Sequence, residues 1–380
     1  MPSSVPIAGA VRGRGAKSNQ TGRYEAAVRE DFDDGWTEAD ARPPRIDDSL
    51  TALKQKTIIS RNDSPDIGFD QSINPYVGCS HGCIYCYARP SHAYMGLSPG
   101  LDFESKLFFK PDAAALLERA LSKPKYVCRP IHIGGNTDPY QPAERIHRIT
   151  RQVLAVLDRF SHPLSIISKS ALIVRDLDIL GPMAARGLVS AAISVTTLDR
   201  GLARAMEPRA ATPERRIGAI SALAAAGVPV TVLFAPVIPG LNDHELEAVL
   251  DRAVAAGAGS AGYTLLRLPL EIKDLFREWL EAERPDRARR VMSLVRQTRD
   301  GKDYDPEWGK RMRGEGPIAE LIARRFRLAV QRLGLNKNRP PLNHDLFAPP
   351  PRTGDQLDLF GLERAPYYSY NYSQKPGTIR

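Results

Sequence analysis

Residues 72–86 read SINPYVGCSHGCIYC, and this stretch sets both the expected fold and the expected chemistry. It begins with a β-type run over 72–77 and ends in a glycine-bearing loop with Cys79, Cys83 and Cys86. Three thiols in this C-x3-C-x2-C spacing can hold one multi-iron cluster, because a cubane presents several corners within reach of a single loop. Three cysteine ligands also leave one iron open. The spacing therefore indicates an iron–sulfur centre that can bind a further molecule.

Zinc is the main alternative at this loop, with His81 or His92 as a fourth ligand. Structural zinc sites usually pair two separated ligand elements, and no second element is visible in the sequence. A further alternative is that the cysteines are buried structural thiols, although packing gives no reason to gather three of them in one loop. We favour an iron–sulfur centre, and both alternatives stay open.

Beyond this loop, β-branched runs alternate with helical patterns. The expected strands span 72–77, 130–134, 164–168, 189–195, 229–235 and 261–267, and the expected helices span 112–121, 142–160, 172–187, 213–226 and 243–256. This alternation predicts parallel strands joined by right-handed crossovers. The predicted fold is therefore α/β, a partial (β/α)6 barrel, with a flat doubly wound sheet as the alternative.

The chain has 380 residues, 42% of them hydrophobic and 26% charged, which suits one barrel-sized domain or two smaller ones. Residues 1–55 and 346–380 lack apolar periodicity and are predicted to be disordered, the barrel is assigned to 56–283, and 284–345 is assigned to a basic helical extension. Within 284–334 there are 14 Lys and Arg against 7 Asp and Glu. Such a segment can neutralise phosphates of nucleic acid, although a solvated amphipathic helix has the same composition.

Composition also indicates the cellular compartment and whether the chain spans a membrane. No signal peptide is visible at the N-terminus and four cysteines are too few for a disulfide framework, so a cytoplasmic protein is expected. The uncharged stretch 217–242 is long enough to span a membrane. Gly227, Pro229, Pro236 and Pro239 break it up, so we expect a buried strand and no membrane association.

The run from Ser72 to Lys110 resembles the radical S-adenosylmethionine (SAM) enzymes, whose signature is C-x3-C-x-aromatic-C, with Tyr85 in the aromatic place. Within that superfamily it looks like the DNA repair photolyase-like branch related to spore photoproduct lyase, and the resemblance covers about residues 55–345. It implies a 4Fe–4S cluster on the three cysteines, SAM bound at the open iron, and an external electron donor. It also implies reductive cleavage of SAM to a 5′-deoxyadenosyl radical that abstracts a hydrogen from the substrate.

In a parallel βα barrel, functional residues lie on the loops that follow the strands. With the resemblance, this rule gives the expected SAM contacts as Gly134, Gly135, Asn136, Thr137, Lys169, Ser194, Ile238 and Gly240. Asn136 stands where the family commonly has the glutamate of Gly-Gly-Glu, so an oxygen of Asn136, Thr137 or Asp138 would receive the SAM amino group. Lys169 would pair with the SAM carboxylate. The alternatives are a plain turn at Asp138 and a solvated surface lysine.

The sequence motif is specific for the cofactor chemistry and much less specific for the substrate. Spore photoproduct lyase uses a cysteine downstream of the cluster as a hydrogen donor, and the matching loop here contains none. Cys128, seven residues before Gly135, is expected to be a structural thiol. The resemblance thus favours radical SAM chemistry acting on damaged or modified nucleic acid, without implying dimer reversal. The alternatives are a peptide or small-molecule substrate, and a non-catalytic metal-stabilised accessory protein of a DNA clamp complex.

The C-terminal tail supplies the clamp hypothesis. Its residues Gln356, Leu357, Leu359 and Phe360 resemble the short peptide with which bacterial polymerases and repair proteins dock onto the sliding clamp. A proline-rich surround suits a segment that folds on binding. Tail residues that pack on their own domain would give the same pattern.

Overall fold

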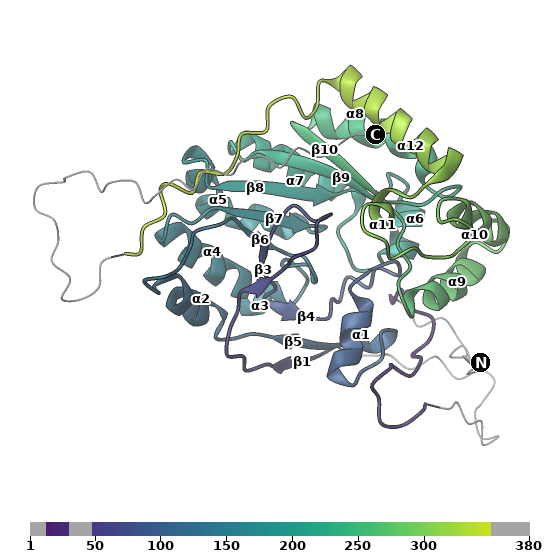
Figure 1. Ribbon diagram of the computed structural model, residues 1–380, viewed down its shortest axis with the longest axis horizontal. Coiled ribbons are helices and arrows are strands. Elements are labelled where there is room, and N and C mark those ends of the chain that lie inside the picture. The colour runs from purple at the N-terminus through teal and green to yellow at the C-terminus, as the bar shows by residue number, and fades with distance from the viewer. Residues whose placement is uncertain (1–12, 30–47, 351–380) are drawn as a thin grey trace, which may run out of the picture.

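The computed structural model describes residues 13–29 and 48–350 (Figure 1). Its main sheet has seven strands within these ranges, in the order β10-β9-β8-β7-β6-β3-β2. They are β2 Ser60–Arg61, β3 Gln71–Ile73, β6 Ile131–Ile133, β7 Leu164–Ser168, β8 Val189–Ser194, β9 Val230–Val237 and β10 Ser260–Leu265. The strands from β3 to β10 are parallel, and only the pairing of β2 with β3 is antiparallel. The predicted α/β partial barrel is confirmed.

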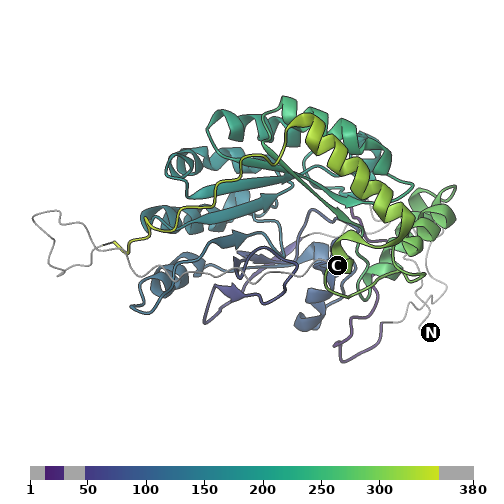
Figure 2. The ribbon, with the colours of Figure 1, turned by 45° about the horizontal axis from the view of Figure 1, so that its top comes forward.

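The crossover helices connect the strands, and all but α6 lie along the outer face of this sheet (Figure 2). They are α2 Ala113–Leu121, α3 Glu144–His147, α4 Ile149–Arg159, α5 Leu177–Ala185, α6 Arg200–Met206, α7 Pro213–Ala225 and α8 Leu246–Ala255, with short 3-10 turns η2 Ala171–Asp176 and η3 Asp243–Glu245. In β7, Leu164 and Ile166 are buried while Ser165 and Ile167 are only half-buried. This alternation shows that helices cover one face of the sheet, as a partial barrel requires.

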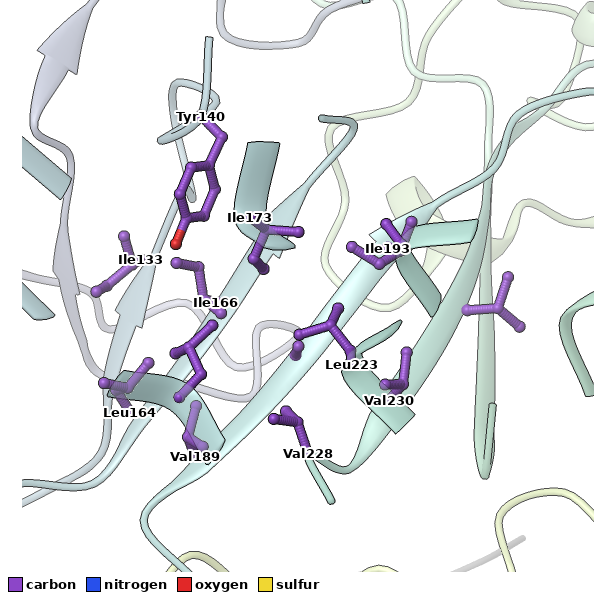
Figure 3. Packing of buried hydrophobic residues seen from close by; sticks show 14 of the residues in the cluster. Ile133, Tyr140, Leu164, Ile166, Ile173, Val189, Ile193, Leu223, Val228 and Val230 are labelled. Atoms are coloured by element: carbon purple, nitrogen blue, oxygen red, sulfur yellow. The ribbon is translucent and has the colours of Figure 1, made fainter. Parts of the chain in front are cut away.

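The core fills the space between the sheet and these helices (Figure 3). Side chains from four neighbouring strands meet residues of the helices and of the loops that precede the strands. The labelled residues are Ile133, Tyr140, Leu164, Ile166, Ile173, Val189, Ile193, Leu223, Val228 and Val230, all buried. Burial of this apolar surface fixes the register of the strands and so aligns the loops that follow them.

Three predicted elements are interrupted. The strand expected over 72–77 splits into β3 and β4 (Tyr76–Val77), because Pro75 has no N–H to donate to a ladder. The helix expected over 142–160 is broken at Arg148, which has a φ of 51° and separates α3 from α4. The helix expected over 172–187 begins as the 3-10 turn η2. The remaining predicted strands and helices form within about three residues of their expected bounds.

A second, smaller sheet in the order β1-β5-β4 lies beside the first. Besides β4 it contains β1 Ser49–Ala52 and β5 Lys106–Phe109, and β5 follows η1 Arg89–Met95 and α1 Leu101–Ser105 in the chain. The sequence analysis did not predict these elements. The cysteine loop follows β4 directly, and the pairing of β4 with β5 holds together the two ends of the segment 78–105 that contains this loop.

Further helices follow the last strand of the main sheet. They are α9 Ile272–Glu283, α10 Ala288–Gln297, α11 Lys310–Arg313 and α12 Gly316–Leu333. Of these, α11 and α12 contact that strand. After α12, Asn336 bonds with Ala261 through both side-chain atoms, at 2.9 and 3.1 Å, and its N–H donates to Gly259. Asn336 thus occupies hydrogen-bonding groups that an edge strand would otherwise expose.

Part of the predicted tails, residues 13–29, 48–55 and 346–350, lies within the described ranges. In the N-terminal stretch, Arg14, Ala16 and Ser18 are buried. Near the C-terminus, Phe347 packs against the rings of Tyr126 and His162. Apolar periodicity could not reveal either segment, because one is held by polar contacts and the other by a single ring. Residues 1–12, 30–47 and 351–380 lie outside the described ranges, and with them Gln356, Leu357, Leu359 and Phe360.

The uncharged stretch 217–242 contains the second half of α7 and all of β9, as expected of a buried strand. Among the described helices, none has the length and apolar character needed to cross a bilayer.

Candidate functional site

The cysteine loop links β4 to η1 at the end of the sheet where the parallel strands terminate. Two glycines allow its shape. Gly78 and Gly82 have φ values of 74° and 68°, and a Cβ on Gly82 would lie 2.6 Å from a carboxylate oxygen of Glu104. A larger residue at either position would strain the backbone and push the loop away from its support.

The three thiols of the loop face a common region. Cys79 and Cys83 are buried and Cys86 is half-buried. Burial raises the pKa of Cys83 well above its usual value, and the charges of Glu207, Cys86 and Cys79 act in the same direction, while Lys169 opposes them. Burial and Cys79 also raise the pKa of Cys86. Negative charges on these neighbouring thiolates repel one another, and a bound iron–sulfur cluster with a cationic core would stabilise them. The three thiols therefore fit an iron–sulfur cluster.

This arrangement differs from that of a site for one ion. No three His, Cys, Asp or Glu side chains of residues 13–29 and 48–350 converge on a position for a single metal ion. A cubane has no such requirement, because each thiolate binds a different corner.

The two histidines considered as zinc ligands have other partners. His92 is buried against Phe103, and its Nε2 lies 2.9 Å from the backbone oxygen of Lys106. His81 Nδ1 lies 3.4 Å from a carboxylate oxygen of Asp138. Burial lowers the pKa of His81, but Asp138 and Cys79 outweigh burial and raise that pKa to about 10. His92 thus has a backbone oxygen as its partner, and His81 has the Asp138 carboxylate.

A buried arginine, Arg89, supports the cysteine loop through hydrogen bonds to its backbone. The Arg89 side chain donates to the backbone oxygens of Cys83, at 2.9 Å, and Gly82, at 3.2 Å, and it pairs with Glu104. Arg89 and the Glu104 side chain are both fully buried, so each depends on the other for its charge. The sequence analysis did not single out either residue, because a lone arginine and a lone glutamate carry no recognisable spacing.

The segment 13–29 completes this support. The N–H groups of Gly15 and Ala16 donate to the Glu104 carboxylate at 2.9 and 2.8 Å. A Cβ on Gly15 would lie only 1.9 Å from the backbone oxygen of Gly82. The N-terminal segment is therefore in direct contact with the cysteine loop and is part of the site.

The loop after β6 carries four of the predicted SAM contacts. Gly134 has a φ of 97°, and a Cβ there would lie 2.6 Å from the backbone oxygen of Ile167. The Gly135 oxygen accepts from Tyr87, the residue that follows Cys86. Gly134 thus allows the loop after β6 to approach β7, and Gly135 connects the same loop to the cysteine loop.

Asn136 and Thr137 have different environments on this loop. Thr137 is buried and its hydroxyl donates to the Tyr76 oxygen at 3.2 Å, so that hydroxyl has a structural partner. Asn136 is half-buried and its Nδ2 donates to Ser91 at 3.2 Å, while no described residue donates to its Oδ1. Of the two, Asn136 retains an acceptor for a bound molecule.

Asp138 ties three loops together. Its carboxylate accepts from the Ser168 hydroxyl and from the Lys169 N–H, each at 2.7 Å, and pairs with His81. Burial would raise the pKa of Asp138, but His81 and these hydrogen bonds lower it to about 2. The carboxylate is thus an anchor whose oxygens are already engaged. It also accepts from the Tyr140 N–H at 2.9 Å, as the plain turn predicts.

Lys169 is the cation of the site. Its ammonium nitrogen lies 5.7 Å from the centroid of the Tyr85 ring, within the cysteine loop. Its charge favours the thiolate form of both Cys83 and Cys86. Lys169 is half-buried rather than fully solvated, and it makes no ion pair with any described residue.

Ser194 belongs to a buried polar network below the cysteine loop. Its hydroxyl donates to the Ala235 oxygen at 3.1 Å. In the same network the Glu207 carboxylate accepts from Tyr85, Thr196 and Arg216. The sequence analysis missed Glu207 and Arg216, which lie on α6–α7 segments far from any recognisable motif.

Ile238 and Gly240 follow β9. Ile238 is buried in the hydrophobic cluster that also contains Cys83, Ile84 and Tyr85 of the cysteine loop. Gly240 has a φ of 77°, and a Cβ there would lie 2.7 Å from Leu294 on α10. Ile238 thus joins the site, whereas Gly240 turns the chain and packs against a C-terminal helix. The Asp243 carboxylate accepts from the Gly240 N–H at 2.7 Å.

Cys128 lies apart from the other cysteines. It precedes β6, at the end of that strand opposite to the loop of Gly134 and Asn136. Burial, with a contribution from Asp345, raises its pKa to about 12. This is the environment of a structural thiol, as expected.

Comparison with known proteins places these observations in a family. The profile described as Radical SAM superfamily matches residues 73–253. An uncharacterized protein of Mycobacterium tuberculosis is 34% identical over 283 residues, which are 74% of this chain and 80% of that protein. An uncharacterized protein of Methanocaldococcus jannaschii is 28% identical over 52% of this chain and 70% of its own length.

Solved structures share the fold. Spore photoproduct lyase complexed with dinucleoside spore photoproduct aligns with a TM-score of 0.53 at 14% identity, over 75% of this chain and 79% of that one. A mutant of the same lyase with bound AdoMet and dinucleoside spore photoproduct also has a TM-score of 0.53, at 13% identity, over 75% and 78% of the two chains. At these identities the likeness concerns the fold.

Proposed function

Because the chain belongs to the radical SAM superfamily, we propose that it is an enzyme that binds one 4Fe–4S cluster on Cys79, Cys83 and Cys86 and reductively cleaves SAM. The observation that carries this proposal is the group of three mutually interacting thiols beside the ammonium of Lys169. When bound, the cluster supplies the electron that splits SAM into methionine and a 5′-deoxyadenosyl radical, which then abstracts a hydrogen from the substrate.

The chain's own residues would position SAM. Lys169 would pair with the SAM carboxylate, since it is a cation at the loop with no acidic partner among the described residues. The free Oδ1 of Asn136 would accept from the SAM amino group, in place of the glutamate common in the family. Ile238 offers apolar surface to the adenine. Arg89 and Glu104 hold the loop rigid so that these contacts keep their geometry.

Reconstitution tests the cluster. Anaerobic incubation with iron and sulfide should load about four irons per chain in the wild type. Cys83→Ala should lose most of this iron, because one corner of the cluster has no ligand. Cys128→Ala is the matched control and should load like the wild type, since that thiol lies at the other end of β6. Zinc bound without sulfide would contradict the proposal and favour the metal-stabilised accessory protein.

For the substrate we propose damaged or modified nucleic acid, with a peptide or a small molecule as the alternatives. Two observations support nucleic acid: the basic composition of 284–334, and the fold shared with a lyase whose solved complexes contain a dinucleoside. The reaction also needs an external electron donor. SAM cleavage that is faster with nucleic acid than without it would favour this substrate class over the alternatives.

We also propose that the tail residues Gln356, Leu357, Leu359 and Phe360 bind the bacterial sliding clamp. The proposal rests on their sequence alone. Replacing Leu359 and Phe360 by Ala should abolish capture of the full chain by immobilised clamp, because the apolar pair would fill the hydrophobic groove. Unchanged capture would remove the proposal.

A further inference from the structure

The basic C-terminal helices close over a cavity on the half-exposed face of β9 and β10. The cavity has a volume of about 470 Å³. Strand residues such as Leu233 and Gly262 form one wall, and Phe326 on α12 forms the other. Arg313, Arg327 and Arg339 also line it, and no Asp or Glu does. The cavity is therefore strongly cationic.

Two of these arginines are not neutralised. Elsewhere on the C-terminal helices, Arg325 pairs with Glu247 and Arg332 pairs with Asp251. By contrast, Arg313 and Arg327 are exposed and have no acidic partner within residues 13–29 and 48–350. Arg339 is fixed by hydrogen bonds to the Ser260 hydroxyl, at 3.0 Å, and to the Ala261 oxygen, at 3.2 Å. The cavity thus presents cations whose charge is available to a ligand.

A buried hydroxyl in the same cavity is also without a partner. The Tyr263 phenol oxygen is inaccessible to solvent, and no described residue bonds with it. Its ring packs on Phe326 with the centroids 4.7 Å apart, which fixes its direction. Burial raises the pKa of Tyr263, while Arg313 and Arg327 act to lower it, so both guanidinium groups are near the phenol. A buried donor of this kind is costly unless a ligand oxygen accepts its proton.

The cavity is connected to the cysteine loop through α11. Arg313 is adjacent in sequence to Met312, whose sulfur lies 3.5 Å from Arg267. The Arg267 guanidinium lies 5.2 Å from the centroid of the Tyr87 ring, next to Cys86. A short series of contacts thus links the lining of the cavity to the cysteine loop.

We infer that this cavity, formed by Arg313, Arg327, Arg339 and Tyr263, binds a phosphate group of the substrate. Guanidinium groups match phosphate oxygens in pairs, and the phenol adds one further donor. The inference rests on the proposed function, because it takes the ligand to be the substrate of that reaction. The phosphate belongs either to a polynucleotide or to a small phosphate ester, and the experiment separates these sources.

The test uses the full chain with its cluster reconstituted. A fluorescent single-stranded oligonucleotide is titrated, and its anisotropy is measured at two salt concentrations. The double variant Arg313→Gln/Arg327→Gln should weaken binding by about tenfold or more and reduce the salt dependence, since two phosphate contacts are lost. Tyr263→Phe should weaken binding by about three- to tenfold through loss of one hydrogen bond.

The matched control is Arg119→Gln/Lys123→Gln, which removes the same charge from exposed positions at the C-terminal end of α2, outside the cavity and outside the basic segment 284–334. It should bind within about twofold of the wild type, since neither side chain lines the cavity. Equal weakening by the two double variants would overturn the site, because it would show a general charge effect. Circular dichroism and the iron content of each variant establish that the fold and the cluster are intact.

Competition identifies the source of the phosphate. An oligomer of the same sequence with an uncharged backbone should fail to bind, and inorganic phosphate should displace the oligonucleotide from the wild type. Binding of a mononucleotide in preference to the oligonucleotide, lost in the arginine double variant, would assign a small phosphate ester. Tight binding of the uncharged oligomer would contradict a phosphate site. Release of 5′-deoxyadenosine by the wild type is measured separately, so failure of the radical chemistry is distinguishable from failure of the site.

Discussion

Lys169 is the residue that we propose to bind the SAM carboxylate. Its ammonium lies beside Tyr85 and favours the thiolates of Cys83 and Cys86, so it already contributes to the charge balance of the loop. The sequence placed a lysine after the third predicted strand but could not exclude a solvated surface position. The structure places that lysine at the cysteine loop because Asp138 holds its backbone N–H.

Replacing this cation tests its proposed role. Lys169→Met should weaken SAM binding by about tenfold to a hundredfold, because a charge-assisted hydrogen bond to a carboxylate contributes about 1.5–3 kcal/mol. The measurement is isothermal titration of SAM into the reconstituted protein. Lys273→Met, an exposed substitution on α9, is the control and should bind SAM normally. Equal SAM affinity in Lys169→Met and the wild type would refute the carboxylate contact.

The buried charged residues around the cysteine loop could not be recognised from the sequence. The cysteines are recognisable from spacing within one loop. Arg89 and Glu104 are separated by 15 residues, and Glu207 and Arg216 belong to a different part of the chain, so only folding brings each pair to the loop. Their side chains satisfy backbone groups and one another, which leaves no periodic pattern in the sequence.

At the scale of elements, the N-terminal segment 13–29 is a part of the site that the sequence did not reveal. Residues 13–29 were expected to be disordered, yet Gly15 and Ala16 bind the carboxylate that supports the cysteine loop. Polar contacts made by backbone N–H groups need no apolar residues. A segment without apolar periodicity can therefore still be held in place, here by hydrogen bonds to the buried Glu104 carboxylate.

A single methyl group tests this contact. Gly15→Ala should release the segment, because the new Cβ would lie 1.9 Å from the backbone oxygen of Gly82. Hydrogen exchange of residues 13–29 should then accelerate by about tenfold or more, as expected for a contact weakened by about 1.4 kcal/mol. Gly68→Ala, where a Cβ would meet nothing within 4 Å, should leave that exchange unchanged. Equal protection in both variants would show that the segment does not depend on this packing.

For the whole molecule, the parallel sheet was predictable and the closing elements were not. Runs such as Leu164–Ser168 and Val189–Ser194 are β-branched and bounded by breakers, so their strands follow from local patterns. The strands β1 and β5 form only through pairing with distant partners, and β2 has only two residues, too few for a recognisable pattern. The basic segment was likewise visible as composition, while the cavity between α12 and β10 depends on how α12 packs.

The central claim is radical SAM chemistry at the cysteine loop, and one measurement tests it most directly. The reconstituted chain is reduced anaerobically in the presence of SAM, and 5′-deoxyadenosine is quantified by mass spectrometry. We expect release by the wild type and by Cys128→Ala, and none by Cys83→Ala. A wild-type protein that binds both the cluster and SAM yet releases no 5′-deoxyadenosine under several reductants would contradict the account.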